Sequence, residues 1–232
     1  MSKNLPKTKL EECFGKPFNG FYLFEKGEIF SNFRKISKMD TALKTHKKYT
    51  FEEYLELEKE SQVRHEFHDG VLIPIEATTK FHNMIITNFI LSADVPKLRA
   101  NGCQLYHENV MTKLKEKKKY VYPDIVITCD KNDIEDSLIV NNPQIIVEIL
   151  SGSTAKYDKA GKFFKYQRSP SLQQYFLISQ YTYAVEYYLK TKEGNWLYDS
   201  LFDLKQKLIL PSLNLEINLS DIYSGIQIEE ED

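Results

Sequence analysis

The chain has no long hydrophobic run and few of the residues that mark secreted or thiolate-metal proteins. No apolar stretch approaches the roughly 20 residues that a membrane-spanning helix needs, and the polar N-terminus has no signal-peptide core. The three cysteines, Cys13, Cys103 and Cys129, lack the spacing of metal ligands. We therefore expect reduced thiols, no membrane association and a cytoplasmic location.

Neither sign of charge dominates the sequence. The 232 residues include 31 Lys and Arg and 33 Asp and Glu, for a net charge of −2, so any surface that binds nucleic acid has to be local. Residues 110–170 carry 11 basic and 8 acidic side chains, and they include the lysine-rich run 113–120. We interpret this run as a solvated hairpin turn that could also clamp a phosphate backbone.

Regular hydrophobic patterning begins only after residue 48, so residues 1–48 are predicted to be a weakly structured extension. Residues 226–232 are predicted to be an acidic tail. Between them, the patterns predict an α/β (α+β) domain over 49–225, with a mixed central β-sheet flanked by helices. The segments behind this prediction are a capped helix at TFEEYLELEKES, a turn and strand at HDGVLIPI, a helix over 81–99 that Pro96 should kink or end, strands at CQLYHENVMTKL, VYPDIVITC and IIVEIL, a helix over 156–168, and strands at YFLIS, AVEYYL and WLYDSLF.

Two acids stand within these apolar strands. Glu148 lies in IIVEIL, where no alternating polar face is available, and burying an ionised acid without a partner costs several kcal/mol. Asp124 lies 24 residues earlier in VYPDIVITC, enough for a loop between two neighbouring strands. Taken singly, Asp124 could be a turn acid and Glu148 an acid on a solvated strand face. Taken together, they would raise each other's pKa unless a cation lay between them, and carboxylates suit Mg²⁺.

The helix predicted after Glu148 offers positive charge. Asp158, Lys162, Lys165 and Tyr166 share one helix face, and a helix starting at the end of the Glu148 strand packs back over that edge of the sheet. Its first turns could bring an ammonium group close to both acids. The alternative is a solvated face with a surface ion pair between Asp158 and Lys162.

In this order, the segments RHEFHDGVL, FHN, YPDIVI, IIVEILSGST, DKAGKFFKY and LQQYFLIS resemble the Uma-family endonucleases of the PD-(D/E)XK restriction-endonuclease-like superfamily, over about residues 49–225. The resemblance implies a restriction-endonuclease-like fold and a metal-dependent DNA endonuclease. The sequence departs from the family at Gly152, where the family has proline. It departs from the parent motif at Leu150, where the superfamily has its catalytic lysine.

The resemblance also implies a set of site residues. Asp124, Glu148 and the carbonyl of Ile149 would bind Mg²⁺ or Mn²⁺, and Glu66 would contribute from the first helix. Lys162 would replace the missing lysine, orienting water and neutralising charge at the phosphate.

Accessory roles are assigned to His82, Asp158 and Lys165, and Lys159 or Lys165 would substitute if Lys162 pointed away. A histidine on a helix face is more often a satisfied structural residue, although the family often has one at the position of His82. The partner implied is DNA, and a homodimer is an option because related nucleases often dimerise.

Two other functions are compatible with the same acids. The first is a catalytically inert nuclease-fold module that binds DNA or a protein partner. The second is a glycosidase that uses Asp124 and Glu148 as acid and nucleophile. The glycosidase is disfavoured because it gives no role to a lysine beside the acids, and because the chain has only one tryptophan, Trp196.

Overall fold

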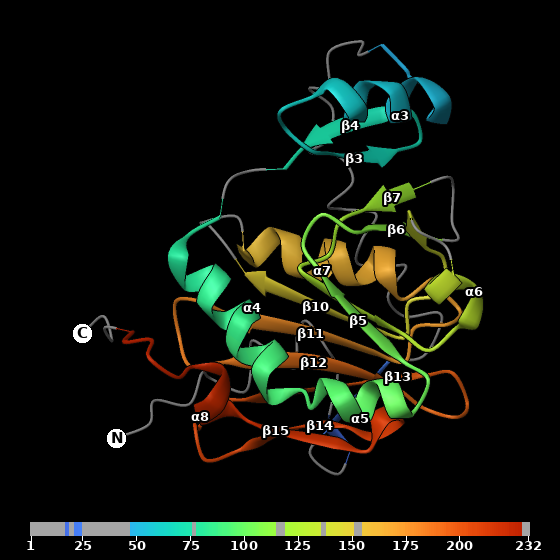
Figure 1. Ribbon diagram of the computed structural model, residues 1–232. Coiled ribbons are helices and arrows are strands. Elements are labelled where there is room, and N and C mark those ends of the chain that lie inside the picture. Colours follow the sequence, from blue (N-terminus) through green and yellow to red (C-terminus); the bar gives the residue numbers. More distant parts are fainter. Residues whose placement is uncertain are drawn as a thin grey trace.

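A large β-sheet, a smaller one and the helices packed on them form the fold, as seen in a computed structural model (Figure 1). The structure describes residues 17–18, 21–24, 47–75, 78–114, 119–135, 138–150 and 155–228, with the backbone alone for 17–18, 21–24 and 155–160. The predicted α/β (α+β) class, with mixed sheet flanked by helices, is confirmed. No helix in the described ranges is both long and apolar enough to cross a bilayer.

The large sheet has eight strands, of which β10 and β11 are parallel and all other neighbours antiparallel. Its strands in spatial order are β1 (Pro17–Phe18), β2 (Phe21–Phe24), β13 (Trp196–Leu201), β12 (Val185–Lys190), β11 (Gln174–Ser179), β10 (Ile145–Leu150), β8 (Ile125–Thr128) and β5 (Gln104–His107). Every residue of β10 is buried, as expected for a strand covered on both faces.

The smaller sheet has five strands. They follow the order β4 (Val71–Pro74), β3 (His65–His68), β7 (Lys119–Val121), β6 (Met111–Leu114) and β9 (Ile139–Val140). The turn between β3 and β4 places Asp69 and Gly70 at φ 52° and 93°, as the Asp-Gly pair predicts. A further hairpin joins β14 (Lys207–Leu210) and β15 (Leu215–Asn218) through a short 3₁₀ turn, η2 (Pro211–Leu213).

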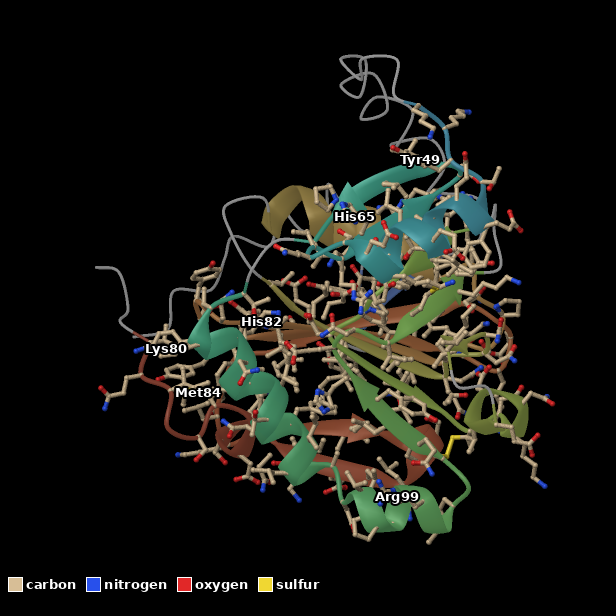
Figure 2. The ribbon with its side chains drawn as sticks, turned by 45° about the horizontal axis from the view of Figure 1, so that its top comes forward. Tyr49, His65, Lys80, His82, Met84 and Arg99 are labelled. Carbon is tan, nitrogen blue, oxygen red and sulfur yellow. A yellow bond between two sulfur atoms is a disulfide. The ribbon has the colours of Figure 1, made fainter. Side chains whose placement is uncertain are left out.

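Each face of the large sheet is covered by different helices. Helix α4 (Lys80–Ser92) packs on one face, with α5 (Val95–Ala100) and α8 (Leu219–Ile222) nearby; Met84 and Arg99 mark α4 and α5 in Figure 2. Helix α7 (Ala155–Tyr166) covers the other face and lies between the two sheets (Figure 1).

The remaining helices are α3 (Phe51–Glu60), on the far face of the small sheet, and α6 (Lys131–Glu135). Helix α3 begins with the predicted capping box, because Thr50 accepts from the Glu53 amide and the Glu53 carboxylate accepts from the Thr50 amide. The helix predicted over 81–99 is instead α4 and α5. Pro96 stands in the first turn of α5, where its missing N–H costs nothing.

The predicted extension over 1–48 contains β1 and β2, which join the edge of the large sheet through β13. Most of this segment, with Cys13, lies outside the described residues, so the boundary near residue 48 stays a prediction. At the other end, Ile226 is buried and Ile228 packs against the core.

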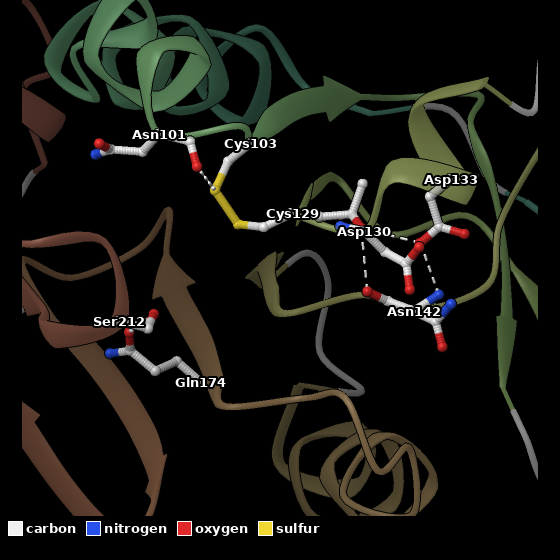
Figure 3. The surroundings of a disulfide bond; sticks show 9 residues. Asn101, Cys103, Cys129, Asp130, Asp133, Asn142, Gln174 and Ser212 are labelled. Atoms are coloured by element: carbon white, nitrogen blue, oxygen red, sulfur yellow. Dashed lines mark hydrogen bonds between the residues drawn. A yellow bond between two sulfur atoms is a disulfide. The ribbon is translucent and has the colours of Figure 1, made fainter.

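The prediction of reduced thiols is wrong for two of the three cysteines. Cys103 and Cys129 form a disulfide with a Cα–Cα distance of 4.0 Å (Figure 3). The reason is the pairing of β5 with β8: Gln104 lies opposite Thr128, so Cys103 and Cys129 occupy the next pair outward. Their 26-residue separation gave no indication of this contact.

We expect the thiols of Cys103 and Cys129 to become reactive only after reduction. After alkylation of the denatured protein, mass spectrometry should find two more labels in the presence of a reductant than in its absence. Replacing both residues by serine should lower the free energy of unfolding by about 2–4 kcal/mol, because the unfolded chain regains the entropy of an open loop. Labelling of all three cysteines without reductant would contradict the disulfide.

Candidate active site

Asp124 and Glu148 lie side by side at one end of the large sheet. Ile125 pairs with Val147 in the antiparallel β8–β10 ladder, so Asp124 and Glu148 are the next residues beyond this pair, and the charge of Asp124 acts on Glu148. The Ile149 amide donates to Asp124 Oδ2 at 2.6 Å, which fixes the two strand ends against each other. The predicted convergence of the two acids is thus present in the structure.

The position of Asp124 follows from the path of the chain between the two sheets. Strand β7 belongs to the small sheet and β8 to the large one, and only residues 122–124 separate them. Pro123 favours an extended residue before it and cannot donate to either ladder. Asp124 therefore lies where the two sheets meet, at the start of β8.

Glu148 is 3% exposed and receives two hydrogen bonds from α7. Lys162 Nζ donates to Oε2 at 3.0 Å, and the Tyr166 hydroxyl donates to Oε1 at 2.6 Å. These two residues are one helical turn apart, so they present their donors on the same face of α7. Lys162 thus points to the acids, and neither substitute lysine is needed for this contact.

The environment of Glu148 favours its neutral form. Burial raises the pKa of Glu148, Lys162 lowers it, Asp124 raises it again, and the net result is a pKa of about 7. For Lys162, burial opposes the charged form, but the charge and hydrogen bond of Glu148, with Asp124 and Glu66, outweigh burial and raise the pKa of the amine. The Lys162 amine therefore stays protonated, with Glu148, Asp124 and Glu66 as its acidic neighbours.

Glu66 also reaches this site, but the prediction that it comes from the first helix is wrong. Helix α3 ends at Glu60, because Ser61 adopts an extended conformation, and Glu66 lies on β3 in the small sheet. Burial pushes the pKa of Glu66 up, but the hydrogen bond and charge of His68, with the charges of Lys162 and Lys165, lower it overall. Glu66 is therefore an ionised acid facing α7.

His82, in the first turn of α4, binds Asp124 from the other side of the sheet. Its Nε2 lies 3.1 Å from Asp124 Oδ2, and the ring is buried. Figure 2 labels His82 near the start of α4. Because the carboxylate is the acceptor, Nε2 carries the hydrogen. Thr79 caps α4 and donates to Gln180, whose amide donates to the Leu150 carbonyl, so the start of α4 is tied to the end of β10.

The sequence did not single out His68. Its Nε2 lies 2.7 Å from Glu66 Oε2, so Glu66 has an orienting partner just as Asp124 and Glu148 have theirs. Alternation along HEFH was the available signal, because residues two apart in a strand share a face. The side chains of Asp158 and Lys159 lie outside the described residues, and the accessory role of Asp158 stays a prediction.

The comparison with family models decides the family. The model named Uma2, described as "Putative restriction endonuclease", matches residues 51–220. The chain belongs to the Uma2 family. The matched range includes Glu66, His82, Asp124, Glu148 and Lys162.

Two relatives are described as uncharacterized proteins of Synechocystis. The protein slr1290 is 30% identical over 175 residues, which are 75% of this chain and 91% of the relative. The protein sll1609 is 34% identical over 160 residues, 68% of this chain and 89% of the relative. The chain therefore spans nearly the full length of both.

A crystal structure from Anabaena variabilis, described as "a putative nuclease belonging to DUF820", has a similar fold. The TM-score is 0.60 at 18% sequence identity, over 77% of this chain and 99% of the other. This likeness supports the fold, while the family match is what connects the chain to nucleases.

The side chains of the site suit a hard cation only if other oxygens complete its coordination. Within the described ranges, no three or more His, Cys, Asp or Glu side chains form a metal cluster. Mg²⁺ is commonly bound through one or two carboxylates, with water and phosphate filling the other positions. Asp124 fits this pattern, because both hydrogen bonds that it accepts from described residues fall on Oδ2. Glu148 fits because a nearby dication would offset the repulsion from Asp124.

We expect Glu148 to make the protein less stable as the pH rises from about 4.5 to about 7. In this window the folded state retains a proton that the unfolded state has lost, because the folded pKa is raised from 4.5 to about 7. The loss should be about 2–3 kcal/mol. The shift of Glu66 has the opposite sign and acts below this window.

The measurement is urea denaturation at about pH 5 and pH 8, without divalent ions, for the wild type and Glu148→Gln. The free energy of unfolding of the wild type should fall relative to that of the variant. Parallel pH dependences for the two proteins would show that Glu148 titrates normally.

Proposed function

We propose that the protein is a metal-dependent DNA endonuclease that hydrolyses phosphodiester bonds through a PD-(D/E)XK-type site. The single observation that carries this proposal is the contact of Lys162 with Glu148, beside Asp124, at a buried strand end. An acid pair can bind a catalytic metal ion, and an amine held against it can stabilise charge on a phosphate, so these groups suit metal-dependent phosphodiester hydrolysis. The Uma2 family match supports the same reaction.

Each residue has a role that follows from its contacts. Asp124 and Glu148, with the Ile149 carbonyl, would hold Mg²⁺ or Mn²⁺. When bound, the cation lowers the pKa of a water molecule and stabilises charge on the phosphate. Lys162 remains charged and neutralises negative charge that develops on the phosphate. Glu66 faces the site from the small sheet.

The displaced position of the lysine has a structural explanation. Leu150, which stands where the parent motif has its lysine, is buried in the core beneath α7. Lys162 comes from the helix that covers the same strand, so its ammonium reaches Glu148 from above the sheet. The amine is thus supplied from a different element to the same carboxylate.

DNA is the proposed substrate because the family match connects the chain to restriction endonucleases. The overall charge is −2, so attraction to phosphate would depend on the lysines of α7 and the basic surplus over 110–170. Cutting both strands of a duplex at the same time would take two such sites, and a homodimer stays a prediction.

We expect Lys162→Met to lower the rate of DNA cleavage at least about 100-fold, because the variant lacks the charge that stabilises the transition state. The matched control is Lys207→Met, since Lys207 also pairs with a glutamate, Glu216 at 2.8 Å, but on an exposed hairpin. The measurement is cleavage of single-stranded, duplex and branched DNA with Mg²⁺ or Mn²⁺, and with EDTA.

The control should cleave at the wild-type rate, and EDTA should abolish cleavage by both proteins. Equal products from wild type and Lys162→Met would identify a contaminating nuclease. DNA binding without cleavage, indifferent to metal, would support the inert nuclease-fold module instead.

A further inference from the structure

Tyr166 is a buried residue whose hydroxyl contacts only one side of the Glu148 carboxylate. It is 2% exposed, and its Oη lies 2.6 Å from Oε1, while Lys162 Nζ lies 3.0 Å from Oε2. The two donors thus take one carboxylate oxygen each.

The direction of this hydrogen bond follows from the chemistry of the pair. The Tyr166 hydroxyl is the donor, and Oε1 of Glu148 is the acceptor. A carboxylate that binds a cation is ionised and only accepts, which agrees with this direction. A short hydrogen bond to a charged acceptor is also one of the stronger kinds in proteins.

The ring of Tyr166 is fixed by packing. It lies against Tyr175, with ring centroids 5.2 Å apart, within the core cluster between α7 and the large sheet. A hydroxyl on such a ring has little freedom to move, so it restricts rotation of the Glu148 carboxylate group. Lys162, by contrast, is a flexible chain whose side chain is 36% exposed.

We propose that Tyr166 is a positioning residue that holds Oε1 of Glu148, so that Oε2, beside Lys162, is the oxygen presented to the cation. The inference rests on the proposed function, because it assigns a role in the same metal site. Partners that orient metal ligands in this way typically contribute 10- to 100-fold to metal affinity.

Tyr175 provides a matched control. It is fully buried in the same cluster, and its hydroxyl has no hydrogen-bond partner among the described residues. Tyr166→Phe and Tyr175→Phe therefore each delete one buried hydroxyl from neighbouring rings. Only the first deletion removes a contact to Glu148.

The experiment is a titration of wild type, Tyr166→Phe and Tyr175→Phe with Mn²⁺ alone, followed by electron paramagnetic resonance of the free ion. We expect Tyr166→Phe to weaken Mn²⁺ binding about 10- to 100-fold and Tyr175→Phe to change it less than about threefold. In cleavage assays, the Mn²⁺ concentration for half-maximal rate should rise for Tyr166→Phe, with the maximal rate largely restored at saturating ion.

Equal affinities in all three proteins would overturn the positioning role and leave the proposed function standing. Equal weakening in both variants would also overturn it, since the cause would then be packing. No Mn²⁺ binding by the wild type would remove both proposals. If Tyr166→Phe fails to fold, a crystal structure of the wild type with Mn²⁺ decides: the ion on Oε2 supports the role, and the ion on Oε1 overturns it.

Discussion

The carboxylate of Glu148 is buried in a strand that has no polar face, and the rest of the site is arranged around it. A buried acid needs donors, and among the described residues the side chains that donate to Glu148 come from α7 and not from the large sheet. Helix α7 supplies two, Lys162 and Tyr166, at a spacing of one helical turn. The helix can do so because it lies between the two sheets and packs its apolar side chains on β10 and β11. Burial of this one acid therefore fixes the register of α7 on the sheet.

The same arrangement shifts the pKa values of Glu148 and Glu66 in opposite directions. Glu148 is shielded from water and lies beside Asp124, and its pKa rises to about 7, whereas His68 and two lysines lower the pKa of Glu66. Pairs of carboxylates whose pKa values are shifted in opposite directions are typical of sites that transfer protons or bind cations. The two acids also come from different sheets, so the site depends on how the small sheet is held over α7.

Local signals predicted much of the fold. The capping box at Thr50, the Asp69-Gly70 turn and the apolar run around Glu148 each specify their element with residues close in sequence. The convergence of Asp124 and Glu148 was also predictable, because strands that lie near each other in the sequence often pair. What failed depended on tertiary pairing: HEFH is too short to distinguish a strand from a helix extension, and the Cys103 disulfide follows from the β5–β8 register. The hydrogen bond from Tyr166 required the placement of α7.

The proposed metal site requires Asp124 and Glu148 to share one hard cation. Calorimetric titration of the wild type and Glu148→Gln with Mg²⁺ tests it most directly, because the amide keeps the size of the side chain and removes its charge. We expect a saturable binding isotherm for the wild type at about pH 8 and loss of that isotherm in the variant. Identical isotherms for the two proteins would show that the cation binds elsewhere and that Glu148 is not one of its ligands.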